Sequence, residues 1–347
     1  MDSATAASTV FVPPAASRPW RLDSLVGHDR IRYYSLARWA LRESLRLAGA
    51  GPGCPVLFPE YICREVLASA AEIGSEPLFY PVDRRLVLAV APSALPKACA
   101  IVAVDFFGFP QELAPFEEYS RRTGALLIED AAHALFSRDG AGRLLGTRTQ
   151  LGVFSLRKSV CLPDGGALAV NDPSLAGAVG PQAAFERHGG GRRSLVRPLA
   201  RRVGGRNMLR LIGLARGLRR LVYGSEIPPA RPDCERRIPG PEGPCSQLSR
   251  PISAADPSLE VQRRRSLYSR CEGLLSPLGA EPVFDRLPEG TAPYVFPYRA
   301  LPADAKRIED ALRDAGLFSL PWPDVPAAVA GRAPSHYTDV RGVHFLW

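Results

Sequence analysis

Residues 154–166 read Phe-Ser-Leu-Arg-Lys-Ser-Val-Cys-Leu-Pro-Asp-Gly-Gly, and the lysine of this stretch is the most informative residue in the chain. Of 44 cationic side chains only three are lysines, namely Lys97, Lys158 and Lys306. An ammonium can lose its proton and act as an amine nucleophile, whereas a guanidinium stays protonated. The sequence therefore favours a chemical role for Lys158 that arginine could not perform.

An aspartate lies about one strand and loop upstream of this lysine. Residues 128–133 read Ile-Glu-Asp-Ala-Ala-His and end an apolar run. Ligands of open α/β sheets bind beyond the carboxyl ends of the strands, so Asp130 and Lys158 form a plausible pair for pyridoxal phosphate. Taken singly, Lys158 could be a solvated surface charge and Asp130 could cap the next helix.

The composition predicts a globular chain with one large and one small domain. No apolar run approaches the roughly 18 residues of a membrane-spanning helix, and residues 1–21 do not resemble a signal peptide. The seven cysteines are scattered, without a CxxC pair or zinc-ligand spacing, so we expect reduced thiols, no metal site and a cytoplasmic location.

The net charge of +9 is concentrated in one segment. Between residues 187 and 220 lie eleven arginines and no acidic residue, in a predicted amphipathic segment over 187–222. This segment could be a surface insertion packed on the domain, a contact with an anionic membrane, or an attractor of phosphate-bearing substrates. It lacks interleaved aromatic residues, so we do not expect nucleic-acid binding.

Apolar strands alternate with helices through the first half of the chain, which predicts an α/β fold with a mostly parallel sheet sandwiched by helices. The expected helices are 36–48, 63–73 and 112–122, and the expected strands are 56–58, 77–82, 100–106, 125–130, 151–156 and 167–170.

The C-terminal part is expected to be a smaller α+β domain, with helices over 258–275 and 303–315 and a strand over 294–299. The predicted organisation is an N-terminal segment (1–30), a large cofactor-binding domain (31–224), a proline- and glycine-rich linker (225–257) and a small domain (258–347).

Four stretches together resemble the DegT/DnrJ/EryC1/StrS family of sugar aminotransferases, which are fold-type I pyridoxal phosphate enzymes. They are residues 51–59, 104–110, 128–133 and 154–166, and they occur in the family's order. Each motif is weak alone, but four at sensible spacing are fairly specific. The resemblance covers residues 30–172 well and the remainder loosely.

The resemblance implies a role for each matching residue. Lys158 would bond to the cofactor's aldehyde carbon and move the proton between the amino acid and the cofactor. Asp130 would keep the pyridine nitrogen protonated. His133 would lie near the phenolic oxygen, and Ser155 would donate to the phosphate. At the start of the first helix, Ala37 and Arg38 would add phosphate contacts through backbone amides.

Several positions depart from the family's pattern. Ala37-Arg38 stands where the family has Gly-Thr, and Thr149-Gln150 replaces Gly-Asp. Cys63 stands where an aromatic residue would stack on the cofactor ring, so Tyr61 is our candidate for that role. Asp105 replaces a histidine. The family's later Asn-x-Arg segment, which reaches into the partner subunit's site, is not recognisable.

The resemblance implies an aminotransferase that takes the amino group from an amino acid, with glutamate as the donor that the family suggests, and gives it to a keto acceptor such as a nucleotide-linked keto sugar. Ping-pong kinetics and a homodimer are also expected. The altered motifs leave open an alternative, in which the chain is a catalytically impaired binding or partner protein of a polysaccharide or natural-product pathway.

Overall fold

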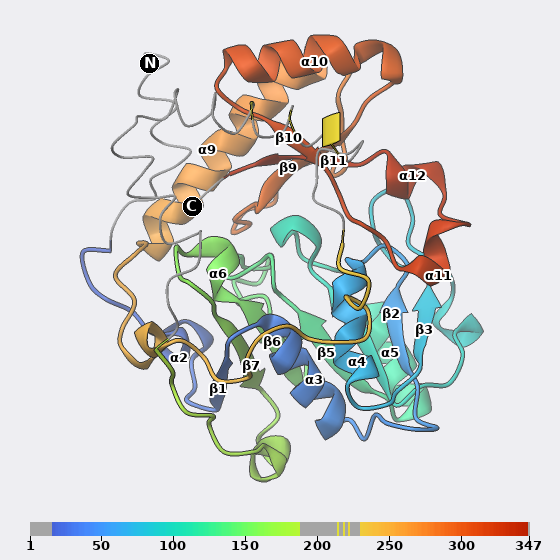
Figure 1. Cartoon of the computed structure of the whole chain (residues 1–347), viewed down its shortest axis with the longest axis vertical. Coiled ribbons are helices and arrows are strands. Elements are labelled where there is room, and N and C mark those ends of the chain that lie inside the picture. Colours follow the sequence, from blue (N-terminus) through green and yellow to red (C-terminus); the bar gives the residue numbers. More distant parts are fainter. Residues whose placement is uncertain (1–15, 188–213, 215–217, 219–220, 223–229, 346–347) are drawn as a thin grey trace.

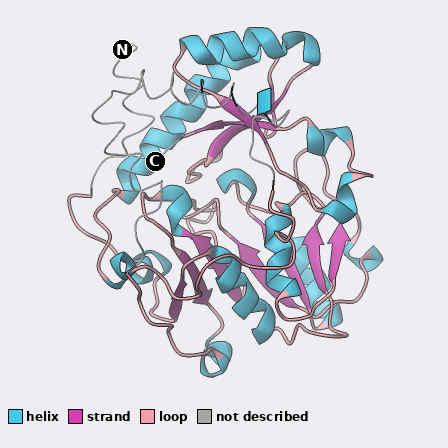
Figure 2. Ribbon diagram, viewed as in Figure 1, coloured by secondary structure: helices cyan, strands magenta, loops and turns pink. Residues whose placement is uncertain are grey.

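The computed structural model describes residues 16–187, 214, 218, 221–222 and 230–345. Nearly all of the arginine-rich segment predicted over 187–222 lies outside these residues. The described chain forms two β-sheets with their helices, one built from the first half of the chain and one from its C-terminal part (Figures 1 and 2). Every helix in the described part is too short or too polar to cross a membrane.

The large sheet has seven strands in the order β1-β7-β6-β5-β4-β2-β3. All pairs from β6 to β3 are parallel, and only β7 runs opposite to its neighbours β6 and β1. This confirms the predicted α/β fold, although the edge strand β1 was not expected. The strands are β1 (Ile31–Tyr34), β2 (Val56–Pro59), β3 (Pro77–Tyr80), β4 (Ala100–Val104), β5 (Leu126–Asp130), β6 (Leu151–Ser155) and β7 (Gly166–Val170).

The central strands are continuous apolar runs because both of their faces are covered, as is usual in parallel sheets. Every residue of β4, β6 and β7 is buried. Helix α3 (Ala37–Leu47) packs against β6 and β7, and α5 (Ala114–Thr123) packs against β4 and β5. These two helices confirm the expected ones over 36–48 and 112–122.

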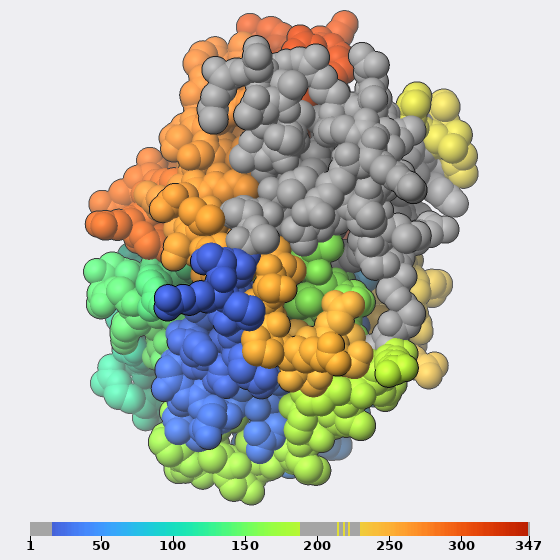
Figure 3. Space-filling model, turned by 90° about the vertical axis from the view of Figure 1, so that its left-hand side faces the viewer, coloured from blue at the N-terminus to red at the C-terminus, as the bar shows by residue number. Residues whose placement is uncertain are grey.

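The C-terminal sheet is antiparallel, with the order β10-β11-β9-β8. Its strands are β8 (Glu281–Pro282), β9 (Val295–Arg299), β10 (Ser319–Pro321) and β11 (Arg341–His344), and its long helices are α9 (Pro257–Leu275) and α10 (Pro302–Asp314). Asp256 caps α9 by accepting from the backbone N–H groups of Ser258 and Leu259. In Figure 3 this orange and red part lies above the blue and green large domain.

The segment expected to be a linker lies along the large domain in its described part, residues 230–256. Ser35 donates its backbone N–H to the carbonyl of Glu242, and Trp20 pairs with Ile252. The remaining short elements are α2 (Leu22–Val26), η1 (Arg64–Leu67), α4 (Ala68–Ala71), η2 (Pro92–Ala94), η3 (Phe106–Gly108), α6 (Leu156–Ser159), η4 (Pro173–Ala178), η5 (Ser246–Ser249), η6 (Ser276–Leu278), α11 (Ala327–Ala330) and α12 (Ser335–Thr338).

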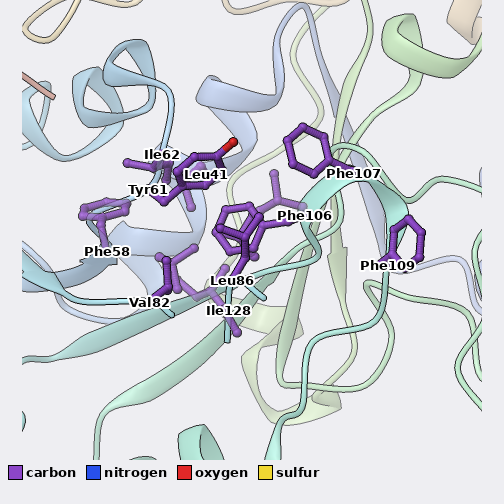
Figure 4. Close-up of a cluster of buried hydrophobic side chains, with 14 of the residues drawn as sticks. Leu41, Phe58, Tyr61, Ile62, Val82, Leu86, Phe106, Phe107, Phe109 and Ile128 are labelled. Carbon is purple, nitrogen blue, oxygen red and sulfur yellow. The ribbon is translucent and has the colours of Figure 1, made fainter. Parts of the chain in front are cut away.

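Aromatic side chains join the two sheets. Figure 4 shows the rings of Phe106, Phe107 and Phe109 leaving one turn in different directions, with Tyr61 nearby. Phe107 packs edge-on against Phe284 and Trp322 of the C-terminal part. These rings belong to one hydrophobic cluster that spans both sheets, so the junction between the sheets is held by buried apolar contacts.

Candidate active site

A cavity of about 360 Å³ lies at the carboxyl ends of β5 and β6, where the large sheet meets the C-terminal part. Its walls come from the start of α3, from η1, from the two strand ends, from α6 and from the C-terminal sheet. The lining residues are Leu36, Ala37, Arg38, Leu41, Cys63, Glu65, Val66, Asp130, Ala132, Val153, Ser155, Arg157, Lys158, Tyr294, Trp322, His344 and Phe345. Five of the seven predicted site residues are among them: Ala37, Arg38, Asp130, Ser155 and Lys158.

Lys158 lies on α6, the single helical turn that follows β6. Its side chain lines the cavity and is half-buried. Nζ lies 2.9 Å from Nε2 of His133 and 6.0 Å from the ring centroid of Tyr294. Burial lowers the pKa of Lys158, while the nearby Cys63 and Asp130 oppose this shift. A partly buried amine with a lowered pKa is suited to nucleophilic attack on a carbonyl.

Asp130 is the last residue of β5 and is buried. Its Oδ1 accepts a 2.9 Å hydrogen bond from the backbone N–H of Ala132. Burial raises the pKa of Asp130, and Lys158 in its ammonium form acts in the opposite direction. The carboxyl group therefore lies in the same cavity and electrostatic environment as the lysine.

His133 does not line the cavity but lies directly behind the lysine. Its ring stacks on that of Tyr294, with centroids 4.6 Å apart and planes 6° apart. Its Nδ1 accepts a 3.3 Å hydrogen bond from the backbone N–H of Phe107. Burial lowers the pKa of His133 well below its usual range, and Lys158 in its ammonium form lowers the pKa further.

The start of α3 lines the same cavity as Lys158 and Ser155. The N-cap residue Leu36 makes no side-chain capping hydrogen bond. The N-terminus of α3, with its first backbone N–H groups not capped by that side chain, therefore lies at the cavity. Nη1 of Arg38 is buried and makes no hydrogen bond to any described residue, although Glu65 Oε2 lies 3.3 Å away. A helix N-terminus beside an incompletely bonded guanidinium is suited to an anion.

The start of α3 approaches the sheet closely because β7 begins with glycine. A Cβ on Gly166 would lie 2.2 Å from the backbone carbon of Leu36 and 2.3 Å from the nitrogen of Ala37. Any side chain at position 166 would therefore push α3 away from the strand ends.

Tyr61, the candidate for stacking on a cofactor ring, does not line the cavity. It is buried beneath it, and its hydroxyl donates to the backbone carbonyl of Trp322. Cys63 reaches the cavity in its place. Burial raises the pKa of Cys63 to about 11, so this thiol is uncharged near neutral pH.

Sequence reasoning missed the residues that the C-terminal part supplies, namely Tyr294, Trp322 and His344. Tyr294 directly precedes β9, Trp322 directly follows β10, and His344 is the last residue of β11. None of them stands in a motif, and they are far from Lys158 in the sequence. Among the described residues, no group of three or more His, Cys, Asp or Glu side chains could hold a metal ion.

Comparison with known proteins gives one family and many similar folds. The model of the DegT/DnrJ/EryC1/StrS aminotransferase family matches residues 34–226. A DegT/DnrJ/EryC1/StrS aminotransferase from Brucella abortus has 20% sequence identity and a TM-score of 0.58, over 93% of this chain and 83% of that one. The aminotransferase TlmJ from Streptoalloteichus hindustanus has 23% sequence identity and a TM-score of 0.60, over 94% of this chain and 83% of that one. DesV of S. venezuelae, solved with a ketimine intermediate, has 21% sequence identity and a TM-score of 0.60, over 93% of this chain and 81% of that one.

Proposed function

Because the chain belongs to the DegT/DnrJ/EryC1/StrS aminotransferase family, we propose that it is a pyridoxal phosphate-dependent transaminase. In this proposal the amino donor is an amino acid, with glutamate as the leading candidate, and the acceptor is a nucleotide-activated keto sugar. The sugar acceptor is suggested by similar folds, among them DesI, which was solved in the presence of its TDP-sugar product and is 18% identical with a TM-score of 0.62. The observation that carries the proposal is that Lys158 and Asp130 line one cavity.

The residues of the cavity fit this cofactor. Lys158 is the amine that would bond to its aldehyde carbon, and Asp130 is the carboxylate that would hold its ring nitrogen protonated. Ser155, Arg38 and the N-terminus of α3 at Ala37 would hold the phosphate, for which the incompletely bonded Nη1 of Arg38 is suited. His133 would lie near the phenolic oxygen of the cofactor, on the side of its ring where Nε2 contacts Lys158.

Pyridoxal phosphate supplies an electron sink for the pair left when the α-proton of an amino acid departs. The protein would supply the base for that step. Lys158, with its lowered pKa, would take the proton from the amino-acid α-carbon and would deliver it to the carbon that had been the cofactor's aldehyde carbon, on the other side of the nitrogen. Asp130 would keep the charge on the sink balanced throughout.

The aromatic wall of the cavity would keep water from the reacting atoms. Tyr294 and Trp322 pack edge-on against each other, with centroids 6.2 Å apart, and both flank His133. An apolar, partly closed site strengthens the electrostatic contacts inside it. The acceptor would enter past these rings and displace any water that remains.

The test is spectroscopic and uses the full chain reconstituted with pyridoxal phosphate. We expect a visible absorption band that glutamate converts to the spectrum of the pyridoxamine form, with release of 2-oxoglutarate. Lys158→Ala should lose the band, whereas Lys97→Ala, at an exposed lysine, should keep it. A colourless wild-type protein after reconstitution would contradict the proposal.

A second candidate function is favoured by the altered residues Arg38 and Cys63. In it the chain retains the fold as a binding or partner protein without turnover. Half-transamination with glutamate would eliminate this candidate. Retention of the absorption band without any response to a panel of amino acids would support it.

A further inference from the structure

Phe107 has a backbone conformation that is rare for a bulky residue. It lies in the left-handed region, with φ 57° and ψ 17°, in the turn after β4. Its N–H donates to Nδ1 of His133 at 3.3 Å, and its carbonyl accepts from the backbone N–H of Tyr294 at 2.8 Å. Backbone strain of this kind persists where the surroundings over-determine it, often at functional sites.

The ring of His133 packs against three other aromatic rings. It stacks on Tyr294 on one face and lies nearly parallel to Phe107, with centroids 5.9 Å apart and planes 12° apart. Trp322 packs against its edge at 5.6 Å. The ring is held in its plane, so each of its nitrogen atoms has one set partner: Phe107 for Nδ1 and Lys158 for Nε2.

These two partners permit one arrangement of protons. A backbone N–H can only donate, so Nδ1 must present its lone pair to Phe107. A neutral imidazole with a lone pair on Nδ1 carries its proton on Nε2. That N–H then points at Nζ of Lys158, 2.9 Å away, and it can bond only to an amine that has a lone pair. An imidazolium, or an ammonium at Lys158, would place two donors face to face at one of these contacts.

We propose that the Phe107 backbone N–H fixes His133 as the Nε2–H tautomer, and that this N–H holds Lys158 as a neutral amine. Phe107 is thus a positioning residue that acts through His133. The inference deepens the proposed function, on which its significance rests, because an amine that is already neutral can attack an aldehyde without first losing a proton.

The charged and titratable groups around the pair are consistent with this arrangement. Those that face Lys158 are Cys63, Asp130, Arg157 and Arg38, and those around His133 are Lys158, His344 and Arg264. Burial acts first on both residues and favours the neutral form of each. Since the Cys63 thiol is uncharged near neutral pH, Asp130 supplies the charge that opposes neutral Lys158, and burial raises the pKa of Asp130 as well.

The test uses the cofactor-free full chain, so it does not depend on turnover. Protein labelled with ¹³C at the lysine ε-carbon should give one signal for each of the three lysines, and Lys97→Arg and Lys306→Arg assign them. Lys97 and Lys306 are exposed and serve as internal references. Histidine labelled with ¹⁵N reports which nitrogen of each ring carries the proton, and His133→Gln assigns the His133 signals among those of the five histidines.

We expect the His133 proton on Nε2, and a Lys158 titration below those of both reference lysines. His133→Leu removes the donor and should raise the Lys158 titration by about 0.5–1 pH unit, a roughly three- to tenfold shift in the amine–ammonium ratio. His133→Gln, whose amide can both accept from Phe107 and donate to Lys158, should leave it in place.

A His133 proton on Nδ1 would overturn the inference, as would a Lys158 signal that titrates with the reference lysines. The wild-type spectra alone decide these two points, even if a variant fails to fold. A negative result here leaves the absorption test of the proposed transaminase untouched, and loss of the absorption band does not alter the titration of the cofactor-free protein, so the two failures are distinguishable.

Discussion

The hydroxyl of Tyr61 donates to the backbone carbonyl of Trp322 over 2.8 Å, and so links the turn after β2 to the end of β10. The ring packs edge-on against Phe106, with centroids 5.4 Å apart, and its exposed fraction is 1%. Tyr61 therefore fastens the C-terminal sheet to the large domain below the cavity, while Cys63, two residues on, reaches the cavity itself.

Tyr61→Phe should lower the free energy of unfolding by about 1 kcal/mol, because it removes one buried hydrogen bond and leaves a carbonyl without its donor. Urea unfolding with and without pyridoxal phosphate measures the loss, which should be the same in both. Tyr80→Phe is the matched control, since Tyr80 donates to the carbonyl of Val102 inside the large domain. A loss that grows with cofactor for Tyr61 alone would mean that its side chain contacts the cofactor.

Arg148→Met should cost about 3–5 kcal/mol of stability. Arg148 bridges Asp105 and Glu129, at 2.8 Å and 2.6 Å, and both carboxylates are fully buried. Burial and the charge of Glu129 raise the pKa of Asp105, so loss of the arginine leaves two buried acids facing each other. Arg143→Met is the control.

Arg143 pairs with Asp139 at the surface and is 60% exposed, so its loss should cost under about 1 kcal/mol. Denaturant unfolding of both variants provides the comparison. Equal losses would show that the buried network contributes no more than a surface ion pair.

Gly166→Ala should weaken retention of pyridoxal phosphate. The new Cβ would overlap the backbone of Leu36 and Ala37, so α3 must move away from the cavity at a cost of about 1–3 kcal/mol. Gly177→Ala is the control, because nothing lies within 4 Å of a Cβ built there. Equilibrium dialysis should show a five- to hundredfold weaker cofactor affinity for Gly166→Ala and an unchanged affinity for Gly177→Ala. Equal affinities of the two variants would argue against a phosphate site at the start of α3.

The buried neutral His133 should make stability fall at acid pH. The pKa of His133 is depressed in the folded chain, while its value in the unfolded chain is about 6.5. Just below pH 6.5 the unfolded chain therefore binds a proton at His133 and the folded chain does not. Stability from this group is present above pH 6.5 and is lost as pH falls below it. Between pH 7.5 and 5.5 the loss should be about 1.4 kcal/mol larger in the wild type than in His133→Gln. Identical pH dependence of urea unfolding in the wild type and in His133→Gln would contradict this role of His133.

The large sheet was predictable because its strands are short apolar runs and its helices are amphipathic, and both patterns are local. Strand β1 was missed, since Ile31–Tyr34 pairs antiparallel at the sheet edge and carries no strong alternation. Three of the four strands of the C-terminal sheet were missed for a related reason. They are two to four residues long, and long-range pairing rather than composition creates them.

The departures from the family's pattern could be noted in the sequence but not explained there. Asp105 stands where a histidine was expected, and only the fold shows that Arg148, 43 residues later, supplies its countercharge. In the same way, nothing in the sequence indicates that Tyr61 points below the cavity while Cys63 lines it.

The sequence alone determined that a lysine after one strand and an aspartate at the end of another belong to one α/β sheet, because parallel strands bring their carboxyl ends to the same edge. The tertiary structure decided what surrounds that pair. Tyr294, Trp322 and His344 reach the cavity from a second sheet, and the left-handed turn at Phe107 sets the hydrogen bond to His133. These contacts depend on how two separately formed sheets pack and on one backbone dihedral angle, neither of which a local residue pattern encodes.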